Sequence, residues 1–201
     1  MKILHVTGGL PIPPLKYGGI ERVVYELAKA QVKKGHEVHI IGIPGYKEIS
    51  GAVWHEPLSE EDGIHVKLNP EIGKFDVLHN HVCNQENTTR FASLFGYKSI
   101  TTFHCNWPDY SRQDILPDIR CWIVNIGAHM AREGPHVLYI PYGIPEGAFC
   151  VEKDNYLYHT GQIGVEKGTD LAIQFAEATN HPLIISGPKR DPNFWEAWIR
   201  G

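Results

Sequence analysis

Strand and helix signals alternate along most of this 201-residue chain, and the first group constrains the fold most. Residues 2–7 form a short apolar run typical of a buried strand. Residues 18–35 carry apolar side chains at helical spacing up to a glycine, and residues 37–42 are again strand-like. A strand, a helix and a second strand with one shared apolar face predict two parallel strands joined by a right-handed crossover.

The same alternation continues after this first unit. Four more strands are expected, at residues 75–82, 99–104, 121–125 and 137–140. One short helix is expected at residues 87–95. Residues 8–16 are rich in glycine and proline, so we expect a loop there and neither a helix nor a central strand. The sequence therefore predicts an α/β fold, with a doubly wound parallel sheet of the Rossmann type over residues 1–145.

A second and smaller domain is expected after a linker at residues 146–155, which show no periodicity. A strand at residues 156–160, a helix at 169–178 and a strand at 182–187 predict another β-α-β unit. One such unit cannot bury both faces of its own sheet. We therefore expect residues 156–201 to form an incomplete domain.

The composition indicates which kinds of binding partner and which cellular compartment to expect. The net charge of −4 gives no basic surface, so nucleic acid is not an expected partner. No apolar run approaches the roughly 18 to 20 residues that span a bilayer, so membrane contact is expected to be at most peripheral. The four cysteines form no C-x-x-C pair and no signal peptide precedes the first strand, which together favour the reducing cytosol.

Ligands of open α/β sheets bind beyond the carboxyl ends of the strands, where three groups are expected to converge. They are the loop that ends at Gly18 and Gly19, His104 at the end of a strand, and the turn at residues 161–168. This turn joins a strand to a helix through glycines and Lys167, a layout that suits a phosphate. The alternative for Lys167 is a solvated side chain without a ligand, and the alternative for His104 is a histidine that serves only packing. The convergence predicts a site in a cleft between the two domains.

Histidines and cysteines on neighbouring strands offer a possible set of metal ligands. His79, His81 and Cys83 alternate along one strand, and His104 and Cys105 follow on another. These ligand types suit zinc, but buried strands often carry them as packing or hydrogen-bonding groups. We expect no metal.

Six motifs in register resemble the retaining glycosyltransferases with two Rossmann domains, the GT-B fold. They are P-L-K-Y-G-G-I-E-R-V-V at residues 14–24, G-H-E-V at 35–38, D-V-L-H-N-H at 76–81, T-T-F-H at 101–104, I-P-Y-G-I at 140–144, and Gly161 with E-K-G at 166–168. The resemblance extends over nearly the whole chain. It implies transfer of a hexose from a nucleotide-diphosphate sugar to an alcohol or glycan acceptor with retention, and no cofactor beyond the donor itself.

The resemblance also implies roles for individual residues. Lys167 would meet the charge on the leaving phosphate, and His104 would contact the transferred sugar. Gly18, Gly19 and Gln162 would join Lys167 in binding the donor. The acceptor would lie against the two remaining residues, His81 and Tyr17.

The chain departs from this family at two residues. Gln162 stands where an arginine is usual, and Tyr142 where asparagine or histidine is common. Family members are also nearly twice as long, so the alternative is a non-catalytic module that binds nucleotide or acceptor and needs a second chain for the missing part. A dinucleotide oxidoreductase is disfavoured because the first turn lacks the G-x-G-x-x-G spacing.

Overall fold

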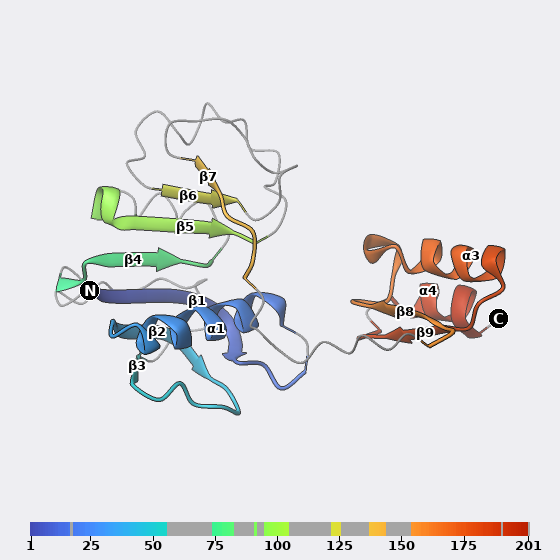
Figure 1. The fold of residues 1–201 in the computed structure, drawn as a ribbon, viewed down its shortest axis with the longest axis horizontal. Helices are drawn as coiled ribbons and strands as arrows, with labels where there is room; N and C mark the ends of the chain where they lie inside the picture. Colours follow the sequence, from blue (N-terminus) through green and yellow to red (C-terminus); the bar gives the residue numbers. More distant parts are fainter. Residues whose placement is uncertain are drawn as a thin grey trace. The chain divides into compact units, whose positions relative to one another are not determined.

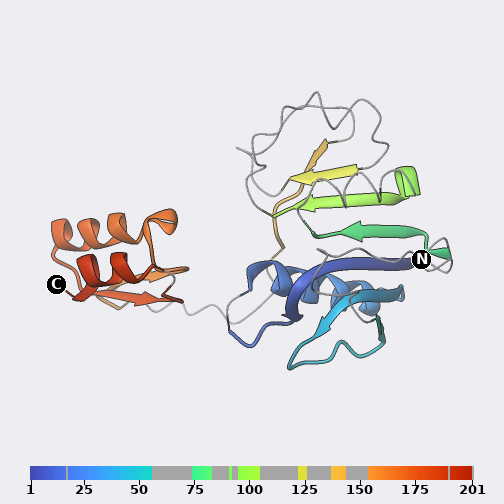
Figure 2. The ribbon, with the colours of Figure 1, turned by 180° about the vertical axis from the view of Figure 1, so that it is seen from behind.

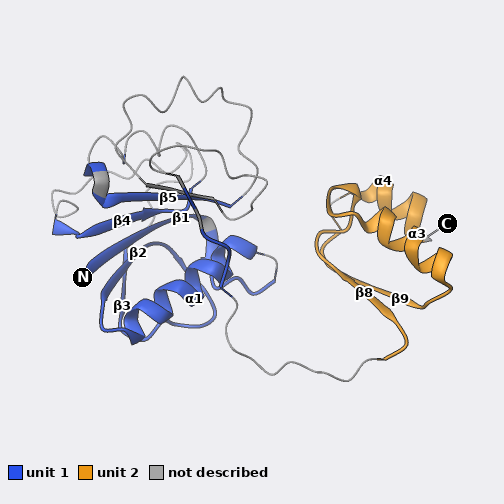
Figure 3. Ribbon diagram, turned by 45° about the horizontal axis from the view of Figure 1, so that its top comes forward, with its two compact units in different colours: residues 1–145 blue, residues 146–201 orange. Residues whose placement is uncertain are grey.

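The computed structural model describes residues 1–16, 18–55, 74–82, 91, 95–104, 122–125, 137–143, 154–189 and 191–200. The chain divides into two compact units, residues 1–145 and residues 146–201 (Figure 3), and each is treated by itself below. Within the described part of the chain, no helix combines the length and the apolar character needed to cross a membrane.

Unit 1 is built on a parallel sheet of seven strands in the order β3-β2-β1-β4-β5-β6-β7 (Figure 1). The strands are β1 Lys2–Ile12, β2 Glu37–Pro44, β3 Ala52–His55, β4 Val77–Asn80, β5 Ser99–Phe103, β6 Trp122–Asn125 and β7 Val137–Tyr139. The order runs one way from β1 to β3 and the other way from β4 onward. The switch point between β1 and β4 is where open sheets of this type bind ligands. The predicted doubly wound α/β fold is confirmed.

Helix α1, Gly19–Lys33, covers one face of this sheet (Figures 1 and 2). Its buried Val24, Tyr25 and Ala28 pack against the side chains of β1 and β2 on the same face, among them Val38 and Ile40. A second core lies on the other face of the sheet and contains Leu4, Val6, Ile41, Phe75, Leu78 and Phe91. Apolar packing on both faces accounts for the near-continuous apolar runs of the central strands.

Two strand assignments differ from the sequence prediction. Strand β1 continues through Ile12, where the sequence predicted a loop from residue 8. The register against β2 shifts between Val6 and Pro11, and this irregularity accommodates glycine and proline residues in the strand. Strand β3, Ala52–His55, was not predicted, because a four-residue edge strand with alternate residues exposed gives little apolar signal.

Two predicted segments lie largely outside the described residues. Of the helix expected at residues 87–95, Phe91 and Phe95 are described, and both are helical. Unit 1 also contains a short 3₁₀ helix, η3, at Gly96–Lys98. Of the linker expected at residues 146–155, residues 154 and 155 are described.

Unit 2 contains a two-stranded parallel sheet with helices on one side (Figure 3). Its elements are β8 Leu157–Thr160, η5 Val165–Lys167, α3 Thr169–Thr179, β9 Leu183–Ser186, α4 Pro192–Trp195 and the π-helical turn η6 Glu196–Arg200. The residues of β8 and β9 alternate between half-buried and exposed. Tyr158 and Ile184 are 58% and 46% exposed, so the outer face of this sheet is open.

Candidate active site

A pocket of about 490 Å³ in unit 1 lies between α1 and the carboxyl ends of β4 and β5. The lining residues come from α1, from the ends of the two strands and from the segment after β7. They are Val23, Glu26, Leu27, Ala30, His79, His81, Thr102, His104, Ile140, Pro141, Tyr142 and Gly143. The position matches the switch-point rule, and two predicted site residues, His81 and His104, are brought together there.

The strand register gathers histidines on the face that α1 covers. His5 of β1 pairs with His79 of β4, and His79 pairs with Ile100 of β5. Because alternate residues of a strand share a face, His81 lies beyond His79, and His104 lies beyond Ile100 on the same side.

A continuous set of hydrogen bonds joins five side chains, which we call the histidine row: Gln31, His5, His81, His104 and Tyr142. Gln31 Oε1 and His5 Nε2 are 2.7 Å apart, and His5 Nδ1 and His81 Nε2 are 3.0 Å apart. His81 Nδ1 lies 3.0 Å from His104 Nε2, and His104 Nδ1 contacts the Tyr142 hydroxyl. Both ring nitrogens of each row histidine are therefore engaged.

The histidines of this cluster are held neutral. Burial lowers the pKa of His5 to about 4, although its hydrogen bond to Gln31 acts in the opposite direction. Burial likewise lowers the pKa of His104 to about 4. Burial, followed by repulsion from the neighbouring imidazoles, holds the pKa of His79 and of His81 well below 6.5. A neutral imidazole offers one donor and one acceptor, which is what each position in the row requires.

His5, His79 and His81 are also close enough to be considered as metal ligands, with one nitrogen from each ring inside a 4.8 Å limit. Neutral imidazole nitrogens suit Zn²⁺. In the structure, however, His5 and His81 bond to each other, and His79 Nε2 lies 2.7 Å from Thr102 Oγ1. A metal would have to replace these hydrogen bonds, so the absence of a metal stays our prediction. Cys83 and Cys105 lie outside the described residues.

Gly18 and Gly19 stand at the start of α1, and their surroundings differ. A Cβ on Gly18 would lie 2.6 Å from Pro14 Cγ, and its φ of +153° is one that side chains rarely adopt. Packing alone therefore requires glycine there. A Cβ on Gly19 would meet nothing within 4 Å, so nothing in the described surroundings explains this glycine. Tyr17 is outside the described residues.

Lys167 and Gln162 lie in unit 2, in the turn that follows the carboxyl end of β8. Lys167 is exposed and makes no ion pair with the residues that the structure describes. Gln162 Nε2 donates to Glu166 Oε2 at 3.5 Å. The turn passes close to the strand end, since a Cβ on Gly187 would lie 1.5 Å from the Gly161 carbonyl oxygen. Both side chains are positioned at the edge where the sequence predicted phosphate binding.

Most backbone amides of this turn already donate to acceptors within unit 2. Thr169 Oγ1 accepts from the Gly164 amide at 3.1 Å and lies 3.1 Å from His159 Nε2, which ties the turn to β8. The amides that already donate within the unit are those of Gly161, Ile163, Gly164, Lys167, Gly168 and Thr169. Of the predicted phosphate-binding groups, the Lys167 side chain is therefore the better placed.

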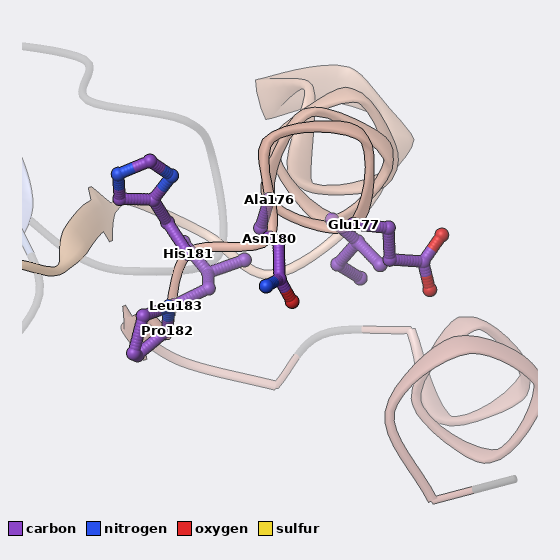
Figure 4. Close-up of a pocket in the computed structure, with 7 residues that line it drawn as sticks. Ala176, Glu177, Asn180, His181, Pro182 and Leu183 are labelled. Atoms are coloured by element: carbon purple, nitrogen blue, oxygen red, sulfur yellow. The ribbon is translucent and has the colours of Figure 1, made fainter.

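Unit 2 has a cavity of its own, of about 470 Å³, at the opposite end of its sheet (Figure 4). It is lined by the last residues of α3, including Ala176 and Glu177, and by the segment from Asn180 to Leu183 that leads into β9. This is the amino end of the strand, away from the turn with Lys167. None of the predicted site residues lines it.

Three members of the histidine row were not singled out as site residues from the sequence. His5 lies in the middle of an apolar strand, Gln31 on a helix, and Tyr142 in the I-P-Y-G-I motif, where it was noted for departing from the family pattern. His5 could have been noticed as a candidate site residue, because it is a titratable residue within an apolar strand. For Gln31 there was none, because its role depends on how α1 lies across the sheet.

Comparisons with known proteins agree with this fold. The family model described as Glycosyltransferase Family 4 matches residues 17–140. A solved structure, that of AviGT4, a glycosyltransferase involved in avilamycin A biosynthesis, is similar over the whole of this chain, with a TM-score of 0.66 and 21% identity. The chain covers 61% of that protein, and at this identity the likeness shows the fold. None of the curated proteins matches the sequence.

Proposed function

Because the chain belongs to glycosyltransferase family 4, we propose that it transfers a hexose from a nucleotide-diphosphate sugar to an alcohol acceptor, with retention of the anomeric configuration. The observation that carries the proposal is the pocket at the carboxyl ends of β4 and β5, most of whose lining residues lie within the family-matched range 17–140. We further propose that the reaction takes place in the cytosol and without a metal.

The proposed reaction breaks the bond between the anomeric carbon and the leaving phosphate oxygen and forms a bond from that carbon to the acceptor oxygen. The acceptor proton passes to the leaving phosphate on the same face of the sugar. No strong protein base is then needed, which fits the neutral histidines of unit 1. With a pKa of about 4, His104 would be a weak base at pH 7.

We assign the roles as follows. The Lys167 ammonium stabilises the negative charge that develops on the leaving phosphate. His104 contacts the transferred sugar, and His81 lies on the acceptor side. Gly19 lets the sugar or the phosphate approach the backbone, since its position is open.

Release of nucleoside diphosphate from UDP-glucose, GDP-mannose and ADP-glucose, in the presence of glycerol as an alcohol, tests this proposal. We expect release from at least one of them, and a fall of about a hundredfold in Lys167→Ala, because removal of one charge-stabilising group costs that much. Lys98→Ala is the matched control, since Lys98 is exposed at the amino end of β5. Equal rates in wild type and Lys167→Ala would remove this lysine from the mechanism.

The second candidate is a non-catalytic module that binds the nucleotide sugar and needs a partner chain for turnover. The open outer face of the β8-β9 sheet, with Tyr158 and Ile184 exposed, favours it. A rise in melting temperature with one of the three sugar nucleotides, without any release of nucleoside diphosphate, would select this candidate.

A further inference from the structure

The histidine row has a direction, which follows from Gln31, the group at the end of the row that does not line the pocket. Gln31 offers a carbonyl oxygen to His5, and a carbonyl oxygen can only accept. The proton of His5 must then be on Nε2, which leaves Nδ1 as an acceptor. His81 Nε2 must then donate to His5 Nδ1, and His104 Nε2 must donate to His81 Nδ1. The proton therefore lies on Nε2 in all three histidines.

The direction ends at the pocket. With its proton on Nε2, His104 has an accepting Nδ1, and the Tyr142 hydroxyl must donate to it. The Tyr142 oxygen then acts toward a ligand as an acceptor. Tyr142 is 38% exposed and lines the pocket, whereas His5 is fully buried and His81 is 3% exposed.

We propose that Gln31, acting through His5 and His81, fixes the proton of His104 on Nε2, so that Tyr142 accepts a hydrogen bond from a hydroxyl group of a neutral sugar or polyol in the pocket. Gln31 and His5 are positioning residues, and Tyr142 is the residue that contacts the ligand. The nature of the ligand rests on the proposed function, whereas the position of the protons does not.

The row orients groups and does not carry protons away. A proton that entered at Tyr142 would have to leave at Gln31, and an amide side chain does not take up a proton near neutral pH. Breaking the row would leave a buried donor or acceptor without its partner, which is unfavourable. Burial therefore keeps the hydrogen bonds of the histidine row in one direction.

The lining of the pocket matches a neutral ligand with several hydroxyl groups. Among the described lining residues, Glu26 has the one acidic side chain, and no lysine or arginine is present. Its carboxylate lies 3.6 Å from Lys29 Nζ and, like the Tyr142 oxygen, accepts hydrogen bonds. Val23, Leu27 and Ile140 add apolar surface. Acceptors beside apolar groups suit the hydroxyls and the C–H faces of a sugar better than a phosphate.

Nitrogen NMR of the histidine side chains tests the direction without any ligand, because the protonated and unprotonated ring nitrogens have distinct shifts. In the full chain we expect His5, His81 and His104 all to carry the proton on Nε2. Gln31→Glu keeps an acceptor and should preserve this pattern. Gln31→Met has a similar length but no acceptor, and should give mixed tautomers as far as His104. Lys33→Met, at an exposed position of α1, is the matched control.

A proton on Nδ1 of His104 in the wild type would overturn the proposal, as would an unchanged pattern in Gln31→Met. In the second arm, methyl α-D-glucopyranoside should shift the His104 signals of the wild type and not those of Tyr142→Phe. Inorganic phosphate should leave them in place. Shifts with phosphate alone, or with neither probe, would contradict the assignment of a neutral ligand. Because the first arm uses no ligand, a failure of glycosyl transfer would leave the tautomer result standing.

Discussion

The two units place their functional groups in opposite environments. In unit 1 the histidine row lies between a seven-stranded sheet and α1, and each ring nitrogen of its three histidines has a hydrogen-bond partner. In unit 2 Lys167 is exposed on a turn above a two-stranded sheet with one open face. Changes to the site in unit 1 should therefore affect stability as well as activity, whereas changes in unit 2 should affect activity alone.

Acid should destabilise unit 1, and this is the largest effect that we expect. The pKa of His5 is about 4 in the folded chain and 6.5 ordinarily, so the unfolded chain binds the extra proton as the pH falls from 6.5 to 4. The free energy of unfolding should fall by about 3 kcal/mol from this histidine alone over that range. Urea unfolding across these pH values measures it. His5→Gln does not titrate and should show a smaller loss; equal losses in the two proteins would contradict the account.

A pair of core substitutions compares the two units directly. Leu78→Ala removes a fully buried side chain from unit 1 and should cost about 2 to 5 kcal/mol. Ile184→Ala, at a site that is 46% exposed in unit 2, should stay within about 0.5 kcal/mol. Hydrogen exchange followed by mass spectrometry assigns each change to its unit. A larger cost for Ile184→Ala would show that the outer face of the β8-β9 sheet is covered in solution.

Gly19→Ala separates function from packing at the start of α1. A Cβ has open space there, so the free energy of unfolding should change by less than about 1 kcal/mol. If a ligand approaches this backbone, turnover should fall by roughly tenfold, because a misplaced ligand loses its productive orientation. Unchanged turnover in Gly19→Ala would show that Gly19 serves only as the first residue of α1.

The smallest effect is expected for Gln162→Arg in unit 2. The side chain at this position already reaches Glu166, and an arginine would add a positive charge beside Lys167. Affinity for the sugar nucleotide should rise a few-fold, because an exposed charge contributes less than about 1 kcal/mol. Calorimetric titration of both proteins at two salt concentrations measures the gain, which should shrink at the higher one. A gain in affinity that does not change with the salt concentration would show that the arginine acts through a contact other than its charge.

Local patterns predicted most of the fold, because the strands of unit 1 are apolar and α1 has a regular apolar spacing. They failed for β3, whose four residues alternate between half-buried and exposed, and for the end of β1, where the register against β2 shifts before Pro11. His104 was predicted because it ends a strand, and His81 because of the family resemblance. Gln31 and His5 were not, since their roles depend on the register of β1 against β4 and on the placement of α1, which no nearby residues encode.

Hydrogen exchange of the full chain with UDP-glucose, GDP-mannose and ADP-glucose tests the location of the site most directly. For a sugar nucleotide that binds, we predict slower exchange in peptides that cover residues 79–82 and 140–143 of unit 1, together with residues 161–168 of unit 2. Protection confined to residues 173–183, around the second cavity, would contradict the account, and so would the absence of protection with all three.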